Sequence, residues 1–200
     1  MSKQASEDKP SEPRLAALAE LIAAEAGARK PPLELWTPDK VADLGFAIAA
    51  DGVWHYQGSP IERAALTRLF ASILRREADG RYYLVTPVEK VVVQVDDAPL
   101  LAVEMWAEGE GAGQALSFRS NLDDVILCGP GQPIRFAPDP ATAAPKPYVS
   151  VRHGLEALAT RAVYLEMVEH GVVENAPEGR SFGVWSRGAF FPMAPAEAVE

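Results

Sequence analysis

The strongest periodicity in the chain lies between Ile61 and Leu74, where apolar side chains recur at the spacing of an α-helix. Charged and small residues fill the intervening positions, so one broad face is apolar and the opposite face is polar. This pattern predicts an amphipathic helix that packs on a core through Ile61, Leu66, Leu69, Phe70, Ile73 and Leu74.

The residues around this stretch have the features of helix ends. Ser59 is a suitable N-cap, Pro60 suits the first helical position, and Glu62 completes an S-x-x-E capping box. Asp79-Gly80 provides a stop, and the turn before it is basic, which suits the negative end of the helix dipole. The predicted helix therefore begins at Pro60 and ends just before Asp79.

Alternating apolar and polar residues predict short strands on both sides of this helix. Asp51-Gly52 marks a turn between a first strand through Phe46 and a second strand at 54–56. Pro87 interrupts a later alternation, and because proline has no N–H we place it at an edge, bend or bulge. Further strands, typical of an antiparallel meander, are predicted at 81–86, 88–95, 99–106, 115–120, 125–128 and 134–136.

The two ends of the chain differ in character. Residues 1–13 are polar and predicted to be disordered, and a narrow apolar stripe predicts a helix over Arg14–Ala28. Near the C-terminus a strand at 148–151 precedes a predicted helix over Leu155–His170, and a final strand follows Gly179-Arg180.

The two amphipathic helices suggest an internal repeat. Alignment of Trp54 with Tyr148 brings the helices into register, and Gly80-Arg81 then corresponds to Gly179-Arg180. Any two amphipathic helices share an apolar face, but that alternative explains the preceding aromatic strand and the following Gly-Arg strand less well. We therefore expect a duplicated strand–helix–strand unit.

These elements predict an α+β fold with antiparallel meander sheets. We expect a tail and N-terminal helix over 1–34, a first α+β domain over 35–95 and a second α+β domain over 96–200.

Charge and composition narrow the classes of partner. The formal net charge is −9, from 19 Lys and Arg against 28 Asp and Glu, which argues against nucleic acid because its backbone requires a basic surface. The sequence contains no apolar run of the ~18 residues that a membrane span needs, and its polar N-terminus lacks a signal-peptide pattern. We expect a cytoplasmic protein, in which a local basic group can still bind a small anion.

Neither a catalytic constellation nor a metal site is predicted. The three histidines lack metal-ligand spacing, and Cys128, the single cysteine, lies in an apolar strand typical of a buried inert thiol. The glycine-rich segment 109–113 lies between two strands, whereas a phosphate-binding loop opens a helix. His55 and His153 each precede a helix, so each suits either a pocket or a strand end. We therefore expect the protein to use no cofactor, and we favour a protein that is not an enzyme.

Two polar segments suit either a structural or a ligand-binding role. Glu89 and Lys90 interrupt a long apolar run, either as charges that protect an exposed sheet edge or as ligand contacts. Asn121 follows a predicted strand, either as a turn cap or as a hydrogen-bonding group for a ligand.

The chain contains the segments Gly58-Ser59-Pro60-Ile61, Leu69-Phe70-Ala71, Arg76-Glu77, Asp79-Gly80, Tyr82–Lys90 and Asp97-Ala98-Pro99. Together these segments resemble a bacterial family, the domain-of-unknown-function family twelve eighty-five, over roughly residues 35–190. The resemblance implies a duplicated core of two related domains, the second similar to a pleckstrin-homology-like fold. It also implies a site for a nucleotide-like ligand at the domain interface and a role in signal transduction.

The functional hypothesis is a non-enzymatic binding or regulatory protein that holds a small anionic, nucleotide-like ligand between its halves. The residues expected to bind this ligand are Arg63, Tyr83, Glu89, Lys90, Asn121 and Arg152. Arg63 and Lys90 would pair with the anion, Asn121 would hydrogen-bond it, and Tyr83 would stack on a ring. The alternatives are a protein-interaction module that binds a peptide or a partner protein and an unrecognised enzyme.

Overall fold

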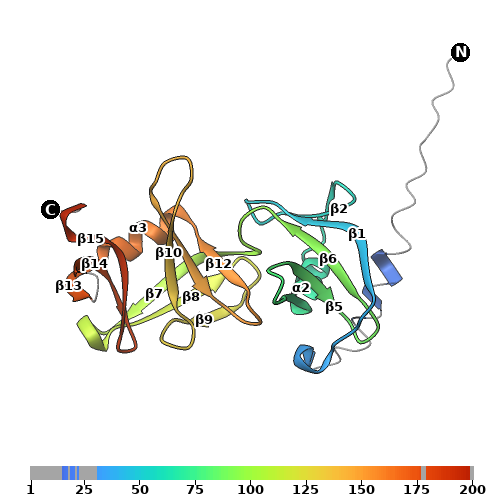
Figure 1. Cartoon of the computed structure of the whole chain (residues 1–200), viewed down its shortest axis with the longest axis horizontal. Helices are drawn as coiled ribbons and strands as arrows, with labels where there is room; N and C mark the ends of the chain where they lie inside the picture. Colours follow the sequence, from blue (N-terminus) through green and yellow to red (C-terminus); the bar gives the residue numbers. More distant parts are fainter. Residues whose placement is uncertain (1–14, 18, 21, 23–30, 177–178, 199–200) are drawn as a thin grey trace, which may run out of the picture. The chain divides into compact units, whose positions relative to one another are not determined.

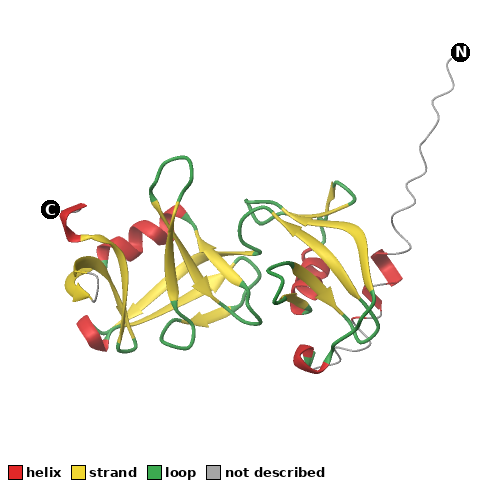
Figure 2. Ribbon diagram, in the orientation of Figure 1, coloured by secondary structure: helices red, strands yellow, loops and turns green. Residues whose placement is uncertain are grey.

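The computed structural model describes residues 15–17, 19–20, 22, 31–176 and 179–198. The chain forms two compact units: unit 1 is Met1–Ala47 with Trp54–Gln94, and unit 2 is Ile48–Val53 with Val95–Glu200. Figure 1 labels most of the elements and Figure 2 colours them by type. Among the described residues, strands outnumber helices in both units. The α+β class is therefore confirmed, with most of the regular structure in strands.

The first sheet has six strands in the order β3-β2-β1-β6-β5-β4. The Lys90 N–H donates to the Lys40 carbonyl over 2.9 Å and the Asp96 N–H donates to the Ile48 carbonyl over 3.0 Å, so β1 and β6 run parallel. In chain order the elements are η1 (Leu33–Leu35), β1 (Val41–Ile48), β2 (Trp54–Tyr56), β3 (Ser59–Pro60), α2 (Ala64–Ser72), β4 (Leu74–Arg76), β5 (Tyr82–Val85) and β6 (Lys90–Val95).

Helix α2 packs on this sheet through aromatic rings. The Phe70 ring lies 5.2 Å from the Phe46 ring and 6.4 Å from the Trp54 ring, between centroids, and the Tyr56 ring lies 4.9 Å from that of Phe46. All of these side chains are at least 95% buried. Phe70, Ile73 and Leu74 of the predicted face therefore lie in the core of unit 1, where large apolar side chains gain most from leaving water. Its other members, Ile61, Leu66 and Leu69, are only half-buried.

The predicted helix from Pro60 to Asp79 is wrong at both ends. Gln57 and Gly58 have φ of 49° and 76°, which gives a two-residue hairpin turn that pairs Tyr56 with Ser59. Ser59 and Pro60 therefore form β3 and do not cap a helix, and the first helical residue is Ala64. At the other end the chain pairs with β5 from Leu74 onward, so the basic turn lies in a strand.

Pro87 lies in the bend between β5 and β6, which is one of the three positions predicted for it. The Thr86 hydroxyl accepts a hydrogen bond from the Glu89 N–H over 3.1 Å and donates to the Glu89 carbonyl over 2.8 Å. These bonds close a tight turn, in which proline's missing N–H leaves no donor unpaired.

The second sheet has six strands in the order β10-β11-β12-β7-β8-β9, and β12 runs parallel to β7. A further sheet of three strands, β13-β14-β15, follows. The elements are β7 (Leu100–Glu108), η2 (Gly111–Gly113), β8 (Ala115–Ser120), β9 (Val125–Leu127), β10 (Ile134–Pro138), β11 (Pro145–Ser150), β12 (Glu156–Ala159), α3 (Arg161–Glu169), β13 (Val172–Ala176), β14 (Gly179–Ser186), β15 (Ala189–Pro195) and η3 (Ala196–Ala198).

The two six-stranded sheets share one topology, which confirms duplicated halves. In each sheet the first and last strands pair in the centre, the next two run outward on one side, and the remaining two return on the other. The predicted alignment of the copies is wrong, because Trp54 lies in the second strand of its sheet and Tyr148 in the fifth. The repeated unit is a six-stranded sheet, not a strand–helix–strand unit or a single meander.

The helices do not correspond between the copies. Helix α2 connects β3 to β4, whereas α3 follows β12, the last strand of the second sheet. The helix predicted over Leu155–His170 begins later than expected, at Arg161, because Glu156–Ala159 forms β12. Thr160 then caps α3 by accepting a hydrogen bond from the Val163 N–H over 3.4 Å.

A buried serine joins the three-stranded sheet to the second six-stranded sheet. The Ser186 hydroxyl accepts a hydrogen bond from the Leu116 N–H and donates to the Cys128 carbonyl, each over 2.9 Å, and its residue is 0% exposed. Nearby, the Gln114 amide donates to the Trp185 carbonyl over 2.9 Å. Backbone groups of β8 and of the segment after β9 thus find their partners on β14.

The N-terminal helix is confirmed for the described residues 15–17, 19–20 and 22, and the rest of the predicted segment lies outside them. In the described part of the chain, no helix is both long and apolar enough to cross a membrane. The pleckstrin-homology-like character expected for the C-terminal half stays a prediction.

Candidate functional site

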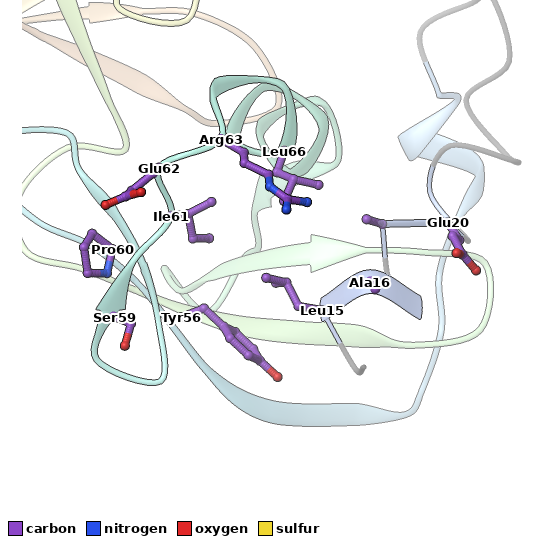
Figure 3. Close-up of a pocket in the computed structure, with 11 residues that line it drawn as sticks. Leu15, Ala16, Glu20, Tyr56, Ser59, Pro60, Ile61, Glu62, Arg63 and Leu66 are labelled. Carbon is purple, nitrogen blue, oxygen red and sulfur yellow. The ribbon is translucent and has the colours of Figure 1, made fainter. Parts of the chain in front are cut away.

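A pocket of about 700 Å³ lies in unit 1, between the N-terminal helical segment and the segment that enters α2 (Figure 3). This volume lies within the range of small-molecule sites. The helical segment contributes Leu15, Ala16, Ala19 and Glu20. The remaining lining comes from a continuous stretch around β3 and from the first turn of α2.

The β2–β3 hairpin positions this stretch. The tight turn at Gln57-Gly58 returns the chain along β2, and the Ile61 N–H donates to the Trp54 carbonyl over 2.7 Å. Ile61 is half-buried as a result, and α2 begins three residues later. This side of the pocket consists of Tyr56, Ser59, Pro60, Ile61, Glu62, Arg63 and Leu66.

Arg63 is the basic group of the pocket. It occupies the N-cap position of α2, but its side chain makes no capping hydrogen bond. In Figure 3 its guanidinium points toward the space between Ile61, Leu66 and Leu15, whereas the Glu62 carboxylate points away from that space. Arg63 forms no ion pair with any residue that the structure describes, so its charge is available to a bound anion.

Among the described lining residues, Arg63 is the only predicted ligand contact. Lys90 and Tyr83 lie together elsewhere in unit 1, with the Lys90 ammonium 5.1 Å from the ring centroid. The Tyr83 hydroxyl donates to the Asp79 carboxylate over 2.8 Å, which raises the pKa of Tyr83. The tyrosine is 3% exposed, so its ring offers no open face for the predicted stacking.

The other three predicted contacts have structural partners. Glu89 pairs with Lys40 at 2.6 Å. In unit 2, Arg152 donates to Asp124 over 2.8 Å. Asn121 accepts from the Leu101 N–H through its side chain over 3.0 Å, and its own N–H donates to the Leu101 carbonyl over 2.8 Å. Both bonds join Asn121 to β7, 20 residues away in sequence, so its side chain holds a neighbouring strand and does not cap its own turn.

Unit 2 contains a charged network that was not predicted from the sequence. The Asp97 carboxylate accepts hydrogen bonds from the Lys146 ammonium and from the Tyr148 hydroxyl, the latter over 2.7 Å. Arg135 covers the Tyr148 ring at 4.0 Å and pairs with Glu156 at 2.5 Å. The partners of Asp97 lie 49 and 51 residues away in sequence, so no local pattern indicates them. The network fastens the segment before β7 to β11.

The pKa of Asp97 reflects two opposing effects. Burial raises the pKa, but the hydrogen bonds from Lys146 and Tyr148 outweigh burial and leave the pKa below its usual value. In Cys128 burial prevails over the opposing hydrogen bonds, among them one with Ser186, and raises the pKa of the thiol to about 11. The thiol is protonated at neutral pH, which is the inert state predicted from the sequence.

Within the described residues, no group of three or more His, Cys, Asp or Glu is arranged to hold a metal ion. The described pocket lining likewise contains neither histidine nor cysteine. The arrangement is therefore suited to binding an anion beside apolar surface, through one guanidinium.

Comparisons with known proteins assign both halves of the chain to the same group. Residues 31–98 match the N-terminal domain, and residues 99–193 the C-terminal domain, of a family described as a protein of unknown function, DUF1285. A crystal structure of a DUF1285 family protein from Silicibacter pomeroyi DSS-3 is 44% identical, with a TM-score of 0.84, and the match covers 97% of this chain and 99% of that one.

A second crystal structure, of a DUF1285 family protein from Shewanella baltica OS155, is 31% identical with a TM-score of 0.50. That match covers 63% of this chain and 91% of the other. No curated protein matches the chain.

Proposed function

We propose that this chain, which belongs to the DUF1285 family, is a non-enzymatic protein that binds a small anionic, nucleotide-like ligand in the pocket of unit 1. The observation that carries the proposal is the Arg63 guanidinium, which faces a pocket of about 700 Å³ and has no ion-pair partner among the described residues.

The rest of the lining suits the body of such a ligand. Ile61, Leu66 and Leu15 are half-buried and line the same space, so a ring or sugar that covers them removes apolar surface from water. The guanidinium contributes a charge-assisted hydrogen bond to a phosphate or carboxylate. Apolar surface with one convergent charged group is the usual composition of a ligand site.

A role in signal transduction follows if ligand occupancy changes what the protein contacts. The location expected from the sequence, at the interface of the two domains, stays a prediction. Of the predicted ligand contacts, Arg63 lines this pocket, and the other contacts to the ligand come from the remaining lining residues.

The test is a thermal-shift screen of nucleotides and related anions with three proteins: wild type, Arg63→Ala and Arg161→Ala. Arg161 is the matched control, because it is an exposed arginine at the start of α3 in unit 2. A ligand at a hundred times its Kd stabilises the folded state by about 2.7 kcal/mol, a shift of roughly 5–10 °C. We expect Arg63→Ala to lose the shift and Arg161→Ala to keep it. A full shift in Arg63→Ala would refute the site.

A second candidate function is protein interaction, favoured by exposed apolar side chains on the second sheet. Val125, Leu127 and Trp106 are 67%, 51% and 47% exposed, and the sheet register places Ser117 between Trp106 and Leu127. Strand β9 is also an edge strand, which can pair with an added strand. Light scattering over a range of concentrations tests self-association, and a constant monomer mass counts against it.

A further inference from the structure

The lining of the pocket carries more negative than positive charge. Arg63 is its basic residue, and Glu20 and Glu62 are acidic, so the described lining has a net charge of −1 (one positive, two negative). A site built for a polyanion has the opposite balance, with several cations around the phosphates. From this imbalance we infer that the pocket selects ligands with a single negative charge on an apolar or aromatic body and discriminates against dianions. The inference rests on the proposed function.

The positions of the three charges explain the selection. The guanidinium of Arg63 points into the pocket, the carboxylate of Glu62 lies on the hairpin side, and Glu20 lies on the side of the N-terminal helical segment (Figure 3). A first anionic group neutralises Arg63. A second anionic group finds no further cation among the described lining residues, and the two carboxylates, which line the pocket without pointing to its centre, repel it through solvent.

The magnitude of this discrimination follows from exposure. Arg63, Glu20 and Glu62 are all exposed, so solvent screens their interactions and each contributes modestly. We expect a monoanion to bind about twofold to fivefold more tightly than a dianion with the same body, which lies within the range measured for exposed charge pairs.

The body of the ligand meets aliphatic side chains on two sides of the pocket. Leu15, Ala16, Pro60, Ile61 and Leu66 provide aliphatic contacts from two sides of the pocket. These aliphatic contacts accept an aromatic ring or a hydrocarbon by shape and do not themselves identify one base. The inferred class is therefore an aryl carboxylate or a cyclic nucleoside monophosphate, chosen by charge and shape.

The experiment measures Kd by titration calorimetry for two probe series at pH 8. Adenosine, 3′,5′-cyclic AMP and AMP share one body and are neutral, singly and doubly charged, because the second phosphate pKa of about 6 makes AMP a dianion. Aryl carboxylate probes repeat the comparison without a nucleoside. They are 1-naphthoate, which is singly charged, and naphthalene-1,4-dicarboxylate, which is doubly charged. The variants are Glu20→Gln, Glu62→Gln and their combination. The matched control is Glu166→Gln, on the exposed face of α3.

We expect wild type to bind the monoanion more tightly than the dianion in every probe series that binds at all. The double variant should reduce the preference to less than about twofold, and Glu166→Gln should leave it unchanged. If wild type binds the dianion as tightly as the monoanion or more tightly, the inference is overturned. A preference for the monoanion that survives in the double variant overturns it as well. Both results leave the proposed function standing. Binding of no probe at millimolar concentration refutes the proposed function itself, and the inference with it.

Discussion

Replacement of Ser186 by alanine tests whether one hydroxyl fastens the three-stranded sheet to the second six-stranded sheet. The side chain is fully buried and makes two hydrogen bonds of 2.9 Å, one from the Leu116 N–H and one to the Cys128 carbonyl. Alanine fits the same space but leaves both backbone groups without that partner. Each buried polar group that loses its partner costs about 1–3 kcal/mol, so for the two groups we expect a total loss of roughly 2–6 kcal/mol. This is a large part of the ~5–15 kcal/mol that stabilises a typical domain.

The measurement is equilibrium unfolding in urea, followed by tryptophan fluorescence and by circular dichroism. Because the chain has two compact units, the loss should fall on the transition of unit 2, and Trp185 beside the substitution reports on it. Ser117→Ala is the control, since this half-buried β8 serine makes no side-chain hydrogen bond within the described part of the chain. A loss below about 0.5 kcal/mol with an unchanged m-value would refute the reasoning.

Two further predictions concern other parts of unit 2. The pKa of Asp97 lies below its usual 3.8, because the hydrogen bonds that the carboxylate accepts outweigh the effect of burial. The ionised carboxylate therefore stabilises the folded state at neutral pH, and this stabilisation is lost as the pH falls through the folded-state pKa. The stability difference between wild type and Asp97→Asn in urea unfolding should therefore shrink below about pH 4, and a difference that stays constant down to pH 2 would contradict this. Separately, a Cβ at Gly171 would lie 2.1 Å from the Phe182 ring, whereas one at Gly131 would meet nothing within 4 Å. Gly171→Ala should lower the Tm by roughly 3–8 °C through overpacking and Gly131→Ala by much less; similar Tm values for the two variants would show that the ring moves without penalty.

Strands that follow clear turn residues were predictable because alternation and turn residues act locally, whereas β3, β4 and β12 lie in segments predicted as helix. The Asp51-Gly52 turn occurs as expected, with the Ala49 N–H bonded to the Val53 carbonyl over 3.0 Å. Helix ends were not predictable in this way, since Ser59 has two competing local uses. Its capping signal competes with the Gln57-Gly58 turn, and the turn prevails because strand pairing holds Ser59 against Tyr56.

The site shows the same division between local and distant information. Arg63 was identifiable because it lies at the start of a helix that the periodicity predicts. The opposite wall of the pocket comes from Leu15 and its neighbours, about four dozen residues earlier, and no pattern in the sequence links the two. Tyr83 shows the reverse error: an aromatic residue near cations suits a ligand site, but here its neighbours are the protein's own Lys90 and Asp79.

The parallel pairing of β1 with β6 has a mechanical consequence. The chain enters the first sheet at Val41 and leaves it at Val95, and because these two central strands run parallel, entry and exit lie at opposite ends of adjacent strands. Tension between the two points therefore acts along the strands, and it loads the interstrand hydrogen bonds together, in shear, instead of opening them one after another. The first sheet is thus expected to resist extension until its whole central ladder breaks, and the same reasoning applies to β7 and β12.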